Sequence, residues 1–410
     1  MQGRRVVVTG LGIISALGNS VEEVWDNIVN CNSGIGPLDH SIYPLPIKIN
    51  NVARVKNYEP TEHFEKKDLD MLDKFAQYCL YSSRQAVKQA GIQFTPELGA
   101  RTAVITGTSI GGEFTHDKAL SDLYLEKKGR AHPFTIPMIM PNAGASQVSM
   151  AYGLTGPAYT VSTACASSNH ALGNAFWLVR NGICDIALTG GSETPLTFGY
   201  LKSWEAIRVV APDTCRPFSK NRQGMILGEG GAMMVIETLE SAKARGAKIL
   251  AEITGFGMTS DASHITKPSQ TGAEHAMANA LKDAGLQPSD IDYINAHGTG
   301  TMVNDSMEIA AIKNVFGDHA TKLSVSSTKS LHGHALGGTS ALEAVITTLA
   351  VMNDILPPTA NFQEHDPECD LDIVPNASRP KEIRHALSNS FAFGGLNAVV
   401  VFSKYTETQS

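Results

Sequence analysis

Short apolar runs alternate with longer amphipathic segments along the whole chain. Each run holds a few β-branched or aliphatic residues next to glycine or a polar residue, which is the pattern of a buried strand. We predict strands at Arg5–Thr9, Thr102–Thr106, Ile186–Thr189, Met233–Glu237, Tyr293–Ala296, Leu323–Ser326 and Ala398–Phe402. Apolar residues recur at helical spacing in Lys74–Ala90, Ser167–Asn181, Gly272–Ala284, Asp305–Val315 and Ser340–Asn353. This alternation indicates an α/β protein with layered, mostly parallel sheets.

The chain also shows signs of an internal duplication. Both halves contain glycine-rich turns after predicted strands, and Lys248–Gly257 reads as a strand that opens a second unit. No low-complexity linker separates the halves. We therefore predict an N-terminal half at residues 1–250 and a C-terminal half at residues 251–410, fused into one body.

Composition and charge argue against several classes of function. The net charge is −7, and no cluster of basic residues suggests a nucleic-acid partner. No apolar stretch reaches the ~18 residues of a membrane span, and the first residues lack the features of a signal peptide. The six cysteines form no CxxC pair, which argues against a zinc site and for a reducing compartment. We expect a cytoplasmic enzyme or binding protein.

The first glycine cluster, Val6–Gly18, partly matches a dinucleotide-binding fingerprint. It offers Gly10 and Gly12 but has Ser15 at the place of a third glycine, and no acidic residue ends a second strand at the expected distance. We favour a tight turn after the first strand.

Cys165 is the first candidate for chemistry. It lies in Ser162–His170 (STACASSNH), a run of small residues directly before a predicted helix. The positive end of the helix dipole would lower the pKa of the thiol, and backbone amides at the turn could bind a carbonyl oxygen. A small buried core cysteine is an equal alternative from this segment alone.

Three later loops carry further polar residues. Asn295–Thr301 (NAHGTGT) places His297 after a strand, and its threonines could hold an extended polar ligand. Ser326–Gly338 (SSTKSLHGHALGG) contains Lys329, His332 and His334, where a cation or a hydrogen-bond chain could fix the tautomer of His334. The two histidines lack a nearby carboxylate or cysteine at ligand spacing, so we do not expect a metal. Ser388–Asn397 (SNSFAFGGLN) puts two phenylalanines before a glycine pair.

These motifs, taken in order, resemble those of the β-ketoacyl-[acyl-carrier-protein] synthases of the elongating type. The resemblance covers essentially the whole chain and includes Arg216–Ala232 (RPFSKNRQGMILGEGGA). The stretch Leu201–Ser219 looks most like the nodulation-protein-E and polyene-forming branch. The resemblance to the family implies a thiolase-like fold, with two pseudo-duplicated halves in αβαβα layers. It also implies a dimer of identical or related subunits.

The resemblance also implies the chemistry. Cys165 would accept an acyl chain from an acyl carrier protein, and the N–H groups of Cys165 and Phe393 would form the oxyanion hole. His297 and His334 would stabilise the enolate left when malonyl-carrier protein loses its carboxylate. Lys329 would position His334, and Glu343 would belong to the same network. The reaction needs no external cofactor, because decarboxylation drives it.

Substrate contacts follow from the same resemblance. Thr299 and Thr301 match the residues that hold the pantetheine arm, Phe393 matches a gate for malonyl entry, and Ile110 matches an acyl-pocket residue. Lys66, Lys67 and Arg208 match carrier-contact positions, and Ala131–Asn142 would reach the dimer interface. The chain departs from the family at Asp70 and Met71, where basic residues are usual, and at Ala392, where glycine is usual.

Two other functions compete with an active decarboxylating synthase. A chain-length-factor partner would shape the pocket of a separate synthase, but such partners lack the nucleophile. A Cys/His hydrolase would use Cys165 and one histidine, and it has no use for the Lys329–His334 loop. The complete set of Cys165, His297 and His334 favours the synthase.

Overall fold

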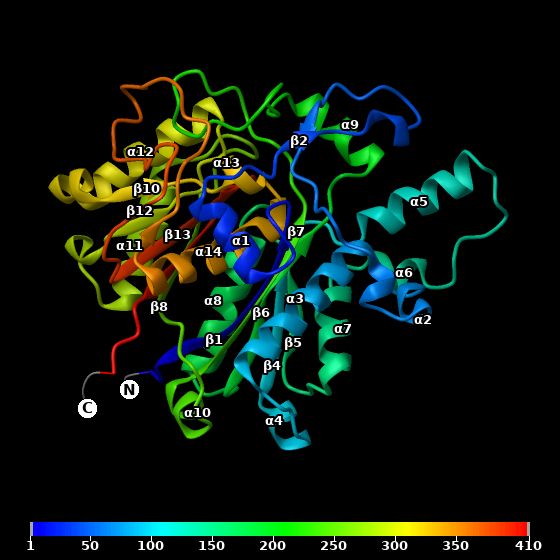
Figure 1. The fold of residues 1–410 in the computed structure, drawn as a ribbon, viewed down its shortest axis with the longest axis horizontal. Helices are drawn as coiled ribbons and strands as arrows, with labels where there is room; N and C mark the ends of the chain where they lie inside the picture. Colours follow the sequence, from blue (N-terminus) through cyan, green and yellow to red (C-terminus); the bar gives the residue numbers. More distant parts are fainter. Residues whose placement is uncertain (1–2, 408–410) are drawn as a thin grey trace.

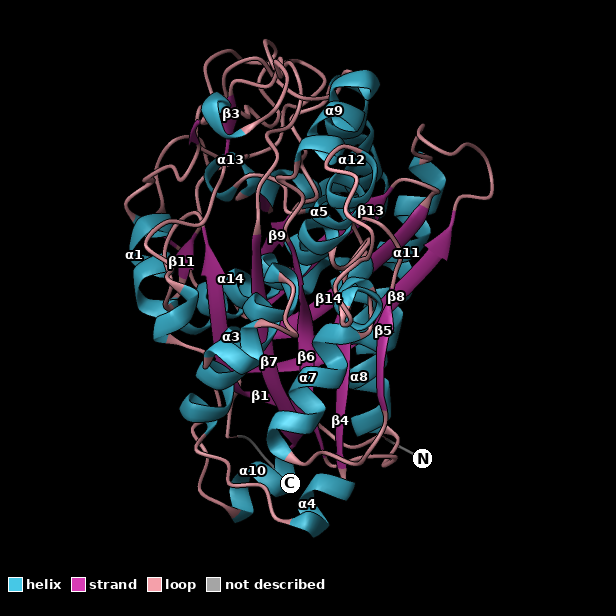
Figure 2. Ribbon diagram, turned by 90° about the vertical axis from the view of Figure 1, so that its right-hand side faces the viewer, coloured by secondary structure: helices cyan, strands magenta, loops and turns pink. Residues whose placement is uncertain are grey.

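The computed structural model describes residues 3–407, whose strands form one large mixed sheet (Figures 1 and 2). The first half contributes β1 (Val6–Ser15), β4 (Thr102–Gly107), β5 (Ala158–Val161), β6 (Ile186–Glu193) and β7 (Gly230–Thr238). The second half contributes β8 (Ala251–Ser260), β9 (Tyr293–Asn295), β10 (Ser324–Ser326), β13 (His385–Ala392) and β14 (Leu396–Ser403). Two small ladders join β2 (Gly36–Pro37) to β3 (Asn51–Val52) and β11 (Ile355–Leu356) to β12 (Arg379–Pro380).

The strand order shows that the second half repeats the first. The ten strands follow the order β10-β9-β13-β14-β8-β1-β7-β6-β4-β5. Read outward from the centre, β1-β7-β6-β4-β5 and β8-β14-β13-β9-β10 have the same connectivity and the same pattern of directions. The halves meet where Val6–Val8 of β1 pair antiparallel with Ala251–Ile253 of β8. The position of a domain boundary near residue 250 stays a prediction.

The expectation of mostly parallel strands is wrong. In each half only the three outermost strands are parallel, and the other pairings are antiparallel. The reason is partly local, since β13 and β14 are joined by the short turn Phe393–Gly395, which can connect only antiparallel strands.

The helices complete five layers of αβαβα type, which confirms the thiolase-like fold. On one outer face, α3 (Lys74–Ala90) and α7 (Ala143–Tyr152) pack on the first half of the sheet. On the other, α11 (Gln270–Ala284) packs on β8 and β14 beside α12 (Met302–Phe316). Between the halves lie α8 (Ser167–Arg180) and α14 (Thr339–Asn353) (Figure 1). Every residue of α14 from Thr339 to Val351 is buried, as expected for a helix between the two halves of the sheet.

The structure contains further helices besides those named above. They are α1 (Val21–Val29), α2 (Lys66–Leu69), α4 (Pro96–Ala100), α5 (Glu113–Tyr124), α6 (Thr135–Ile139), α9 (Phe198–Ile207), α10 (Leu239–Ala244) and α13 (Lys329–His332). Turns of 3₁₀ helix occupy His40–Ile42, Pro60–Glu62, Pro288–Asp290, Gly317–Lys322 and Leu336–Gly338. None of the helices within residues 3–407 is long and apolar enough to cross a membrane.

The glycine cluster near the start is not a turn. Strand β1 runs from Val6 to Ser15 without a break in the chain direction, straight through Gly10 and Gly12. A Cβ atom on either glycine would overlap a backbone carbonyl of α3, at Ala86 or Ser82. The glycines therefore allow close packing of α3 on β1, which corrects the prediction of a tight turn.

Candidate active site

Cys165 lies in the turn that connects β5 to α8. Ala164 adopts the left-handed region, with φ of +49°, and so bends the chain sharply. Ala166 is the N-cap residue, and α8 begins at Ser167. Cys165 is buried, with 8% of its surface exposed, and it lines a cavity of about 480 Å³. His297 and His334 line the same cavity.

His297 is held through its backbone on the loop that follows β9. The carboxylate of Glu308, on α12, accepts hydrogen bonds from the N–H groups of His297 and Gly298, both 2.8 Å long. Gly298 has a φ of +38°, which favours glycine in this loop. Glu308 therefore fixes the point from which the imidazole of His297 enters the cavity.

His334 has a defined tautomer. Its Nδ1 accepts a hydrogen bond from the backbone N–H of Leu336 at 3.1 Å and lies 2.9 Å from the hydroxyl of Thr339. A backbone N–H can only donate, so Nδ1 carries no proton and the proton of the neutral ring is on Nε2. His334 thus offers a hydrogen-bond donor from Nε2. Leu336, with φ of +46°, orients the N–H that sets this tautomer. Of the two alternatives that the sequence left open, a cation or a hydrogen-bond chain, it is a hydrogen bond that sets the tautomer of His334.

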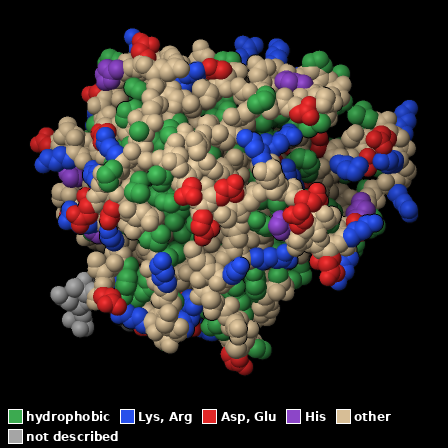
Figure 3. Space-filling view, viewed as in Figure 1, with side chains coloured by type: hydrophobic (Ala, Val, Ile, Leu, Met, Phe, Trp, Pro, Cys, Tyr) green, Lys and Arg blue, Asp and Glu red, His purple; other side chains and the backbone are tan. Residues whose placement is uncertain are grey.

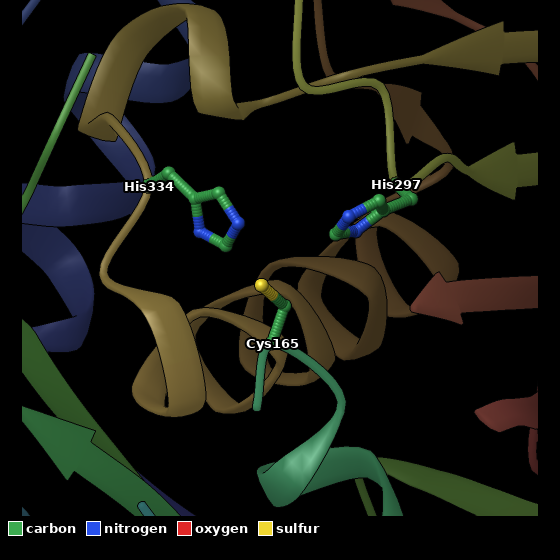
Figure 4. Close-up of side chains that lie close together, drawn as sticks. All are labelled: Cys165, His297 and His334. Atoms are coloured by element: carbon green, nitrogen blue, oxygen red, sulfur yellow. The ribbon is translucent and has the colours of Figure 1, made fainter. Parts of the chain in front are cut away.

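The three side chains converge on one point of the cavity (Figure 4). The rings of His297 and His334 are 5.6 Å apart between centroids and meet edge to face, at 83°. One ring nitrogen from each histidine and the sulfur of Cys165 all lie within 4.8 Å of one another. Three such atoms could in principle surround a metal ion. However, Nε2 of His334 carries a proton, so the site offers a hydrogen-bond donor there and not a free lone pair.

Burial keeps both histidines neutral. It lowers the pKa of His297 and of His334 well below the ordinary value, and the nearby ammonium of Lys329 lowers both further. Lys329 is itself fully buried, with its ammonium 2.5 Å from Oε1 of Glu343. Burial raises the pKa of Glu343 to about 7, against the pull of Lys329. The cavity therefore presents two neutral imidazoles beside a buried ion pair.

The pKa expected for Cys165 is wrong in direction. Burial raises the pKa of this thiol to about 11, although Lys329 and the backbone N–H groups of Phe393 and Cys165 oppose the rise. Desolvation of the thiolate is the largest of these effects. The free site therefore holds a thiol. The two N–H groups that face the sulfur are those expected for the oxyanion hole.

Comparisons with known proteins decide the family. Residues 3–242 match the β-ketoacyl synthase N-terminal domain, and residues 250–363 match the C-terminal domain of the same family. The chain belongs to the β-ketoacyl synthase family. Enzymes of this family are acyltransferases that catalyse a condensation, and the resemblance found in the sequence is confirmed.

Relatives cover the chain from end to end. Nodulation protein E of Rhizobium sp. (strain N33) is 45% identical over 400 residues, 97% of this chain and 99% of the relative. The 3-oxoacyl-[acyl-carrier-protein] synthase 2 of Staphylococcus aureus (strain COL) is 42% identical over 411 residues, 98% and 99% of the two chains. Among solved structures, the ishigamide ketosynthase/chain length factor has a TM-score of 0.93 at 36% identity, covering 98% of this chain and 100% of that one.

Several family positions meet at the cavity. Thr299 and Thr301 line it, with their hydroxyls 2.9 Å apart. Phe393 also lines it, at the tip of the β13–β14 turn, and stacks on Trp204 with ring centroids 6.1 Å apart. Arg208, at the end of α9, is an exposed residue of the cavity wall.

Other expected residues lie elsewhere. Ile110 is not among the residues that line this cavity, and 38% of its surface is exposed in the single chain. Lys66 and Lys67 are exposed on α2, where Lys67 pairs with Glu65. Their parts in acyl binding and carrier contact remain predictions.

Sequence reasoning missed three residues of this ketoacyl synthase site. Glu308 holds the backbone of His297, Trp204 supports Phe393, and Glu193 bonds to the loops at Ser109 and Gly337. The sequence signal for these carboxylates is weak: Glu308 lies in the predicted helix Asp305–Val315, and Glu193 follows the predicted buried strand Ile186–Thr189. A buried carboxylate needs hydrogen-bond donors, and its presence there points to a constrained loop.

Proposed function

We propose that this chain is a 3-oxoacyl-[acyl-carrier-protein] synthase that lengthens an acyl chain held on Cys165, in fatty-acid or polyene- and polyketide-type elongation. One observation carries the proposal: a cysteine, two neutral histidines and two backbone N–H groups converge in one cavity. A nucleophile, donors for an enolate oxygen and an oxyanion hole are the groups that a decarboxylating condensation requires.

The first half-reaction is thioester exchange. The sulfur of Cys165 attacks the carbonyl of the acyl-carrier thioester, and the N–H groups of Cys165 and Phe393 stabilise the oxyanion. The bond to the pantetheine sulfur then breaks. The proton of the Cys165 thiol ends on the departing pantetheine sulfur, so the exchange consumes no proton overall.

The second half-reaction is the condensation. Malonyl-carrier protein loses carbon dioxide, and the electron pair of the broken bond forms an enolate on the thioester. His334 donates from Nε2 to the enolate oxygen, and neutral His297 faces the same point. The enolate carbon attacks the acyl-Cys165 carbonyl. Cys165 leaves as a thiolate and takes up one proton to regain its resting thiol.

Intact-protein mass spectrometry tests the proposal. Incubation with an octanoyl-carrier protein should add one octanoyl group to the wild-type chain and none to Cys165→Ala. Addition of malonyl-carrier protein should then yield a 3-oxodecanoyl carrier and release carbon dioxide. His334→Ala should still accept the octanoyl group but decarboxylate malonyl more slowly. Absence of any acyl adduct on the wild-type enzyme would contradict the proposal.

The alternative function, a non-catalytic chain-length-factor subunit, is less well supported. A chain-length-factor subunit would shape a pocket without a nucleophile, whereas Cys165 and both histidines are present and converge. We propose instead that the chain pairs with a second copy or with a related subunit. Supporting this, β5 is an edge strand of the sheet, and apolar side chains of β5 and of the segment around α6 are exposed in the single chain. These are Phe134, Ile136, Met140 and Tyr159.

Light scattering tests the pairing. Ile136→Glu places a charge on the exposed apolar face and should shift the enzyme toward the monomer mass. Leu45→Glu changes a residue that is exposed to the same extent and is not one of these four, and it should leave the mass unchanged. All six cysteines are free, which supports our proposal that the enzyme works in the reducing cytoplasm.

A carrier protein, as an acidic partner, needs a basic surface. We propose that Arg208, at the cavity, receives it together with Lys66 and Lys67. A competing basic surface is the projecting arm of α5 and the loop after it, where Figure 3 shows several Lys and Arg side chains. Lys127 and Arg130 of that loop are exposed. Arg208→Glu should raise the KM for the carrier substrate more than Lys127→Glu does, and the reverse order would move the docking site to the arm.

A further inference from the structure

Glu193, the last residue of β6, collects hydrogen bonds from two separate loops. Its carboxylate accepts from the hydroxyl of Thr108 at 2.8 Å and from the backbone N–H and hydroxyl of Ser109 at 2.6 and 2.7 Å. Weaker bonds come from the N–H groups of Ile110 at 3.3 Å and Gly337 at 3.1 Å. All five partners are donors, and 1% of the surface of Glu193 is exposed.

Within residues 3–407 this carboxylate forms no ion pair, so hydrogen bonds from N–H and hydroxyl groups are what oppose the rise in its pKa that burial causes. A buried carboxylate without these donors would be costly. The two loops are therefore held to each other through one side chain. Gly337 leaves room for this contact, since a Cβ atom there would lie 2.6 Å from Oε2 of Glu193.

We expect the two loops to serve different parts of the reaction. Thr108–Ile110 carries the residue expected to line the acyl pocket. Gly337 directly follows Leu336, whose N–H bonds to Nδ1 of His334 and fixes its tautomer. Leu336 holds a left-handed conformation that is unfavourable for leucine, so its neighbours must hold it there. The bond from Gly337 to Glu193 is one such restraint.

We propose that Glu193 is a positioning residue for both half-reactions: one carboxylate ties the acyl-pocket loop at Ser109–Ile110 to the turn that sets the tautomer of His334. The inference rests on the proposed function and deepens it. Loss of this carboxylate frees both loops, so it changes the choice of acyl chain and slows malonyl decarboxylation together.

The test compares Glu193→Leu with Glu193→Gln on two readouts. The first is the ratio of hexanoyl to dodecanoyl transfer from carrier protein to Cys165, measured by intact mass. The second is the rate of malonyl-carrier decarboxylation. Glu193→Leu should lower decarboxylation by about 10–100-fold, the cost of a small misplacement of a reacting group, and should change the transfer ratio. Glu193→Gln keeps one oxygen for Ser109 and Gly337, so it should stay within about threefold of wild type on both.

A purely structural role gives a different result. Loss of folded enzyme scales every rate by the same factor and leaves the transfer ratio unchanged. The matched control is Glu237→Leu, a buried carboxylate of β7 that lies opposite Ile186, the first residue of β6, and bonds to Thr9 and Arg245. It should lower stability without changing the ratio.

A folded Glu193→Leu enzyme with either readout unchanged overturns the proposal. If that variant fails to fold, Gly337→Ala disturbs the same contact from the other loop. It should change both the transfer ratio and the decarboxylation rate. A change in only one of them also overturns the proposal. Failure of the wild-type enzyme to accept any acyl group contradicts the proposed function and is recorded separately, before either variant is compared.

Discussion

The ammonium of Lys329 and the carboxylate of Glu343 form an ion pair that is wholly buried behind the two histidines. Removing one member of such a pair leaves a buried polar group and costs about 3–5 kcal/mol, whereas replacing both by apolar side chains costs far less. We expect Lys329→Met to lower the free energy of unfolding by about this amount at pH 8. The double variant with Glu343→Met should recover most of the loss. Urea unfolding of the four proteins measures the coupling, and additive losses would contradict it.

The same pair affects the pH dependence of decarboxylation. Burial is the main cause of the low histidine pKa values, and the charge of Lys329 is the second. In Lys329→Met the second cause is absent, so the histidine pKa values rise part of the way toward their ordinary value. The decarboxylation rate should then begin to fall at a higher pH than in the wild type as the solution is acidified. Rates measured from pH 5 to pH 8 test this shift, and an unchanged acid limb would exclude Lys329 as its source.

Glu113 should make stability depend on pH. Burial raises the pKa of this carboxyl from 4.5 to about 7, and the negative charges of Glu193, Asp73 and Asp117 add to the rise. Its neutral form therefore stabilises the fold below pH 4.5, and this contribution is lost as the pH rises through 7. Glu113→Gln stays neutral, so its stability relative to wild type should increase between pH 5 and pH 8, by on the order of 2 kcal/mol.

The control for Glu113 is Glu97, an exposed residue whose pKa is lowered by backbone and Thr95 hydrogen bonds. Glu97→Gln should lose stability relative to wild type as the pH rises from low values, the opposite sign. Thermal unfolding from pH 3 to pH 8 supplies the comparison. A Glu113→Gln variant that follows the Glu97→Gln trend would show that the wild-type Glu113 carboxyl is ionised throughout.

Local patterns predicted the elements well, and the pairing between them poorly. Helix α3 has the predicted bounds because its signals are adjacent in sequence: Asp73 caps the first turn and Gly91 ends the helix in the left-handed region. The directions of the strands and the packing of Gly12 against Ser82 depend on residues far apart. Nothing near Gly12 in the sequence distinguishes a turn from a close helix contact.

The same contrast between local and long-range features holds for the active site. The motifs identified Cys165, His297 and His334, but not the rise in the thiol pKa, because desolvation depends on what surrounds the sulfur in the folded chain. Glu193 binds Ser109 and Gly337, which are 84 and 144 residues away in sequence. Such contacts have no local signature. The sequence therefore predicted which groups react and could not predict what orients them.

Trp204 should control how readily Phe393 moves. The two rings are stacked at 27°, and Phe393 precedes Gly394 and Gly395, which both have positive φ and form the turn. An aromatic contact of this kind contributes about 0.5–1.5 kcal/mol. If Phe393 must move to admit malonyl-carrier protein, Trp204→Ala makes that movement easier in the free enzyme. Malonyl decarboxylation by the unacylated enzyme should then rise about 2–10-fold relative to the acylated enzyme.

Ala392→Gly provides the matched comparison, because it frees the backbone of the same turn without touching the aromatic stack. It should raise the same ratio, and it should also alter the kinetics of malonyl entry and the choice of acyl chain. Trp177→Ala serves as the control, since Trp177 packs on Phe256 and does not line the cavity of Cys165. Decarboxylation of radiolabelled malonyl-carrier protein, with and without prior acylation of Cys165, gives the ratio directly. If Trp204→Ala and Ala392→Gly both match the Trp177→Ala control, Phe393 does not act as a gate in this enzyme.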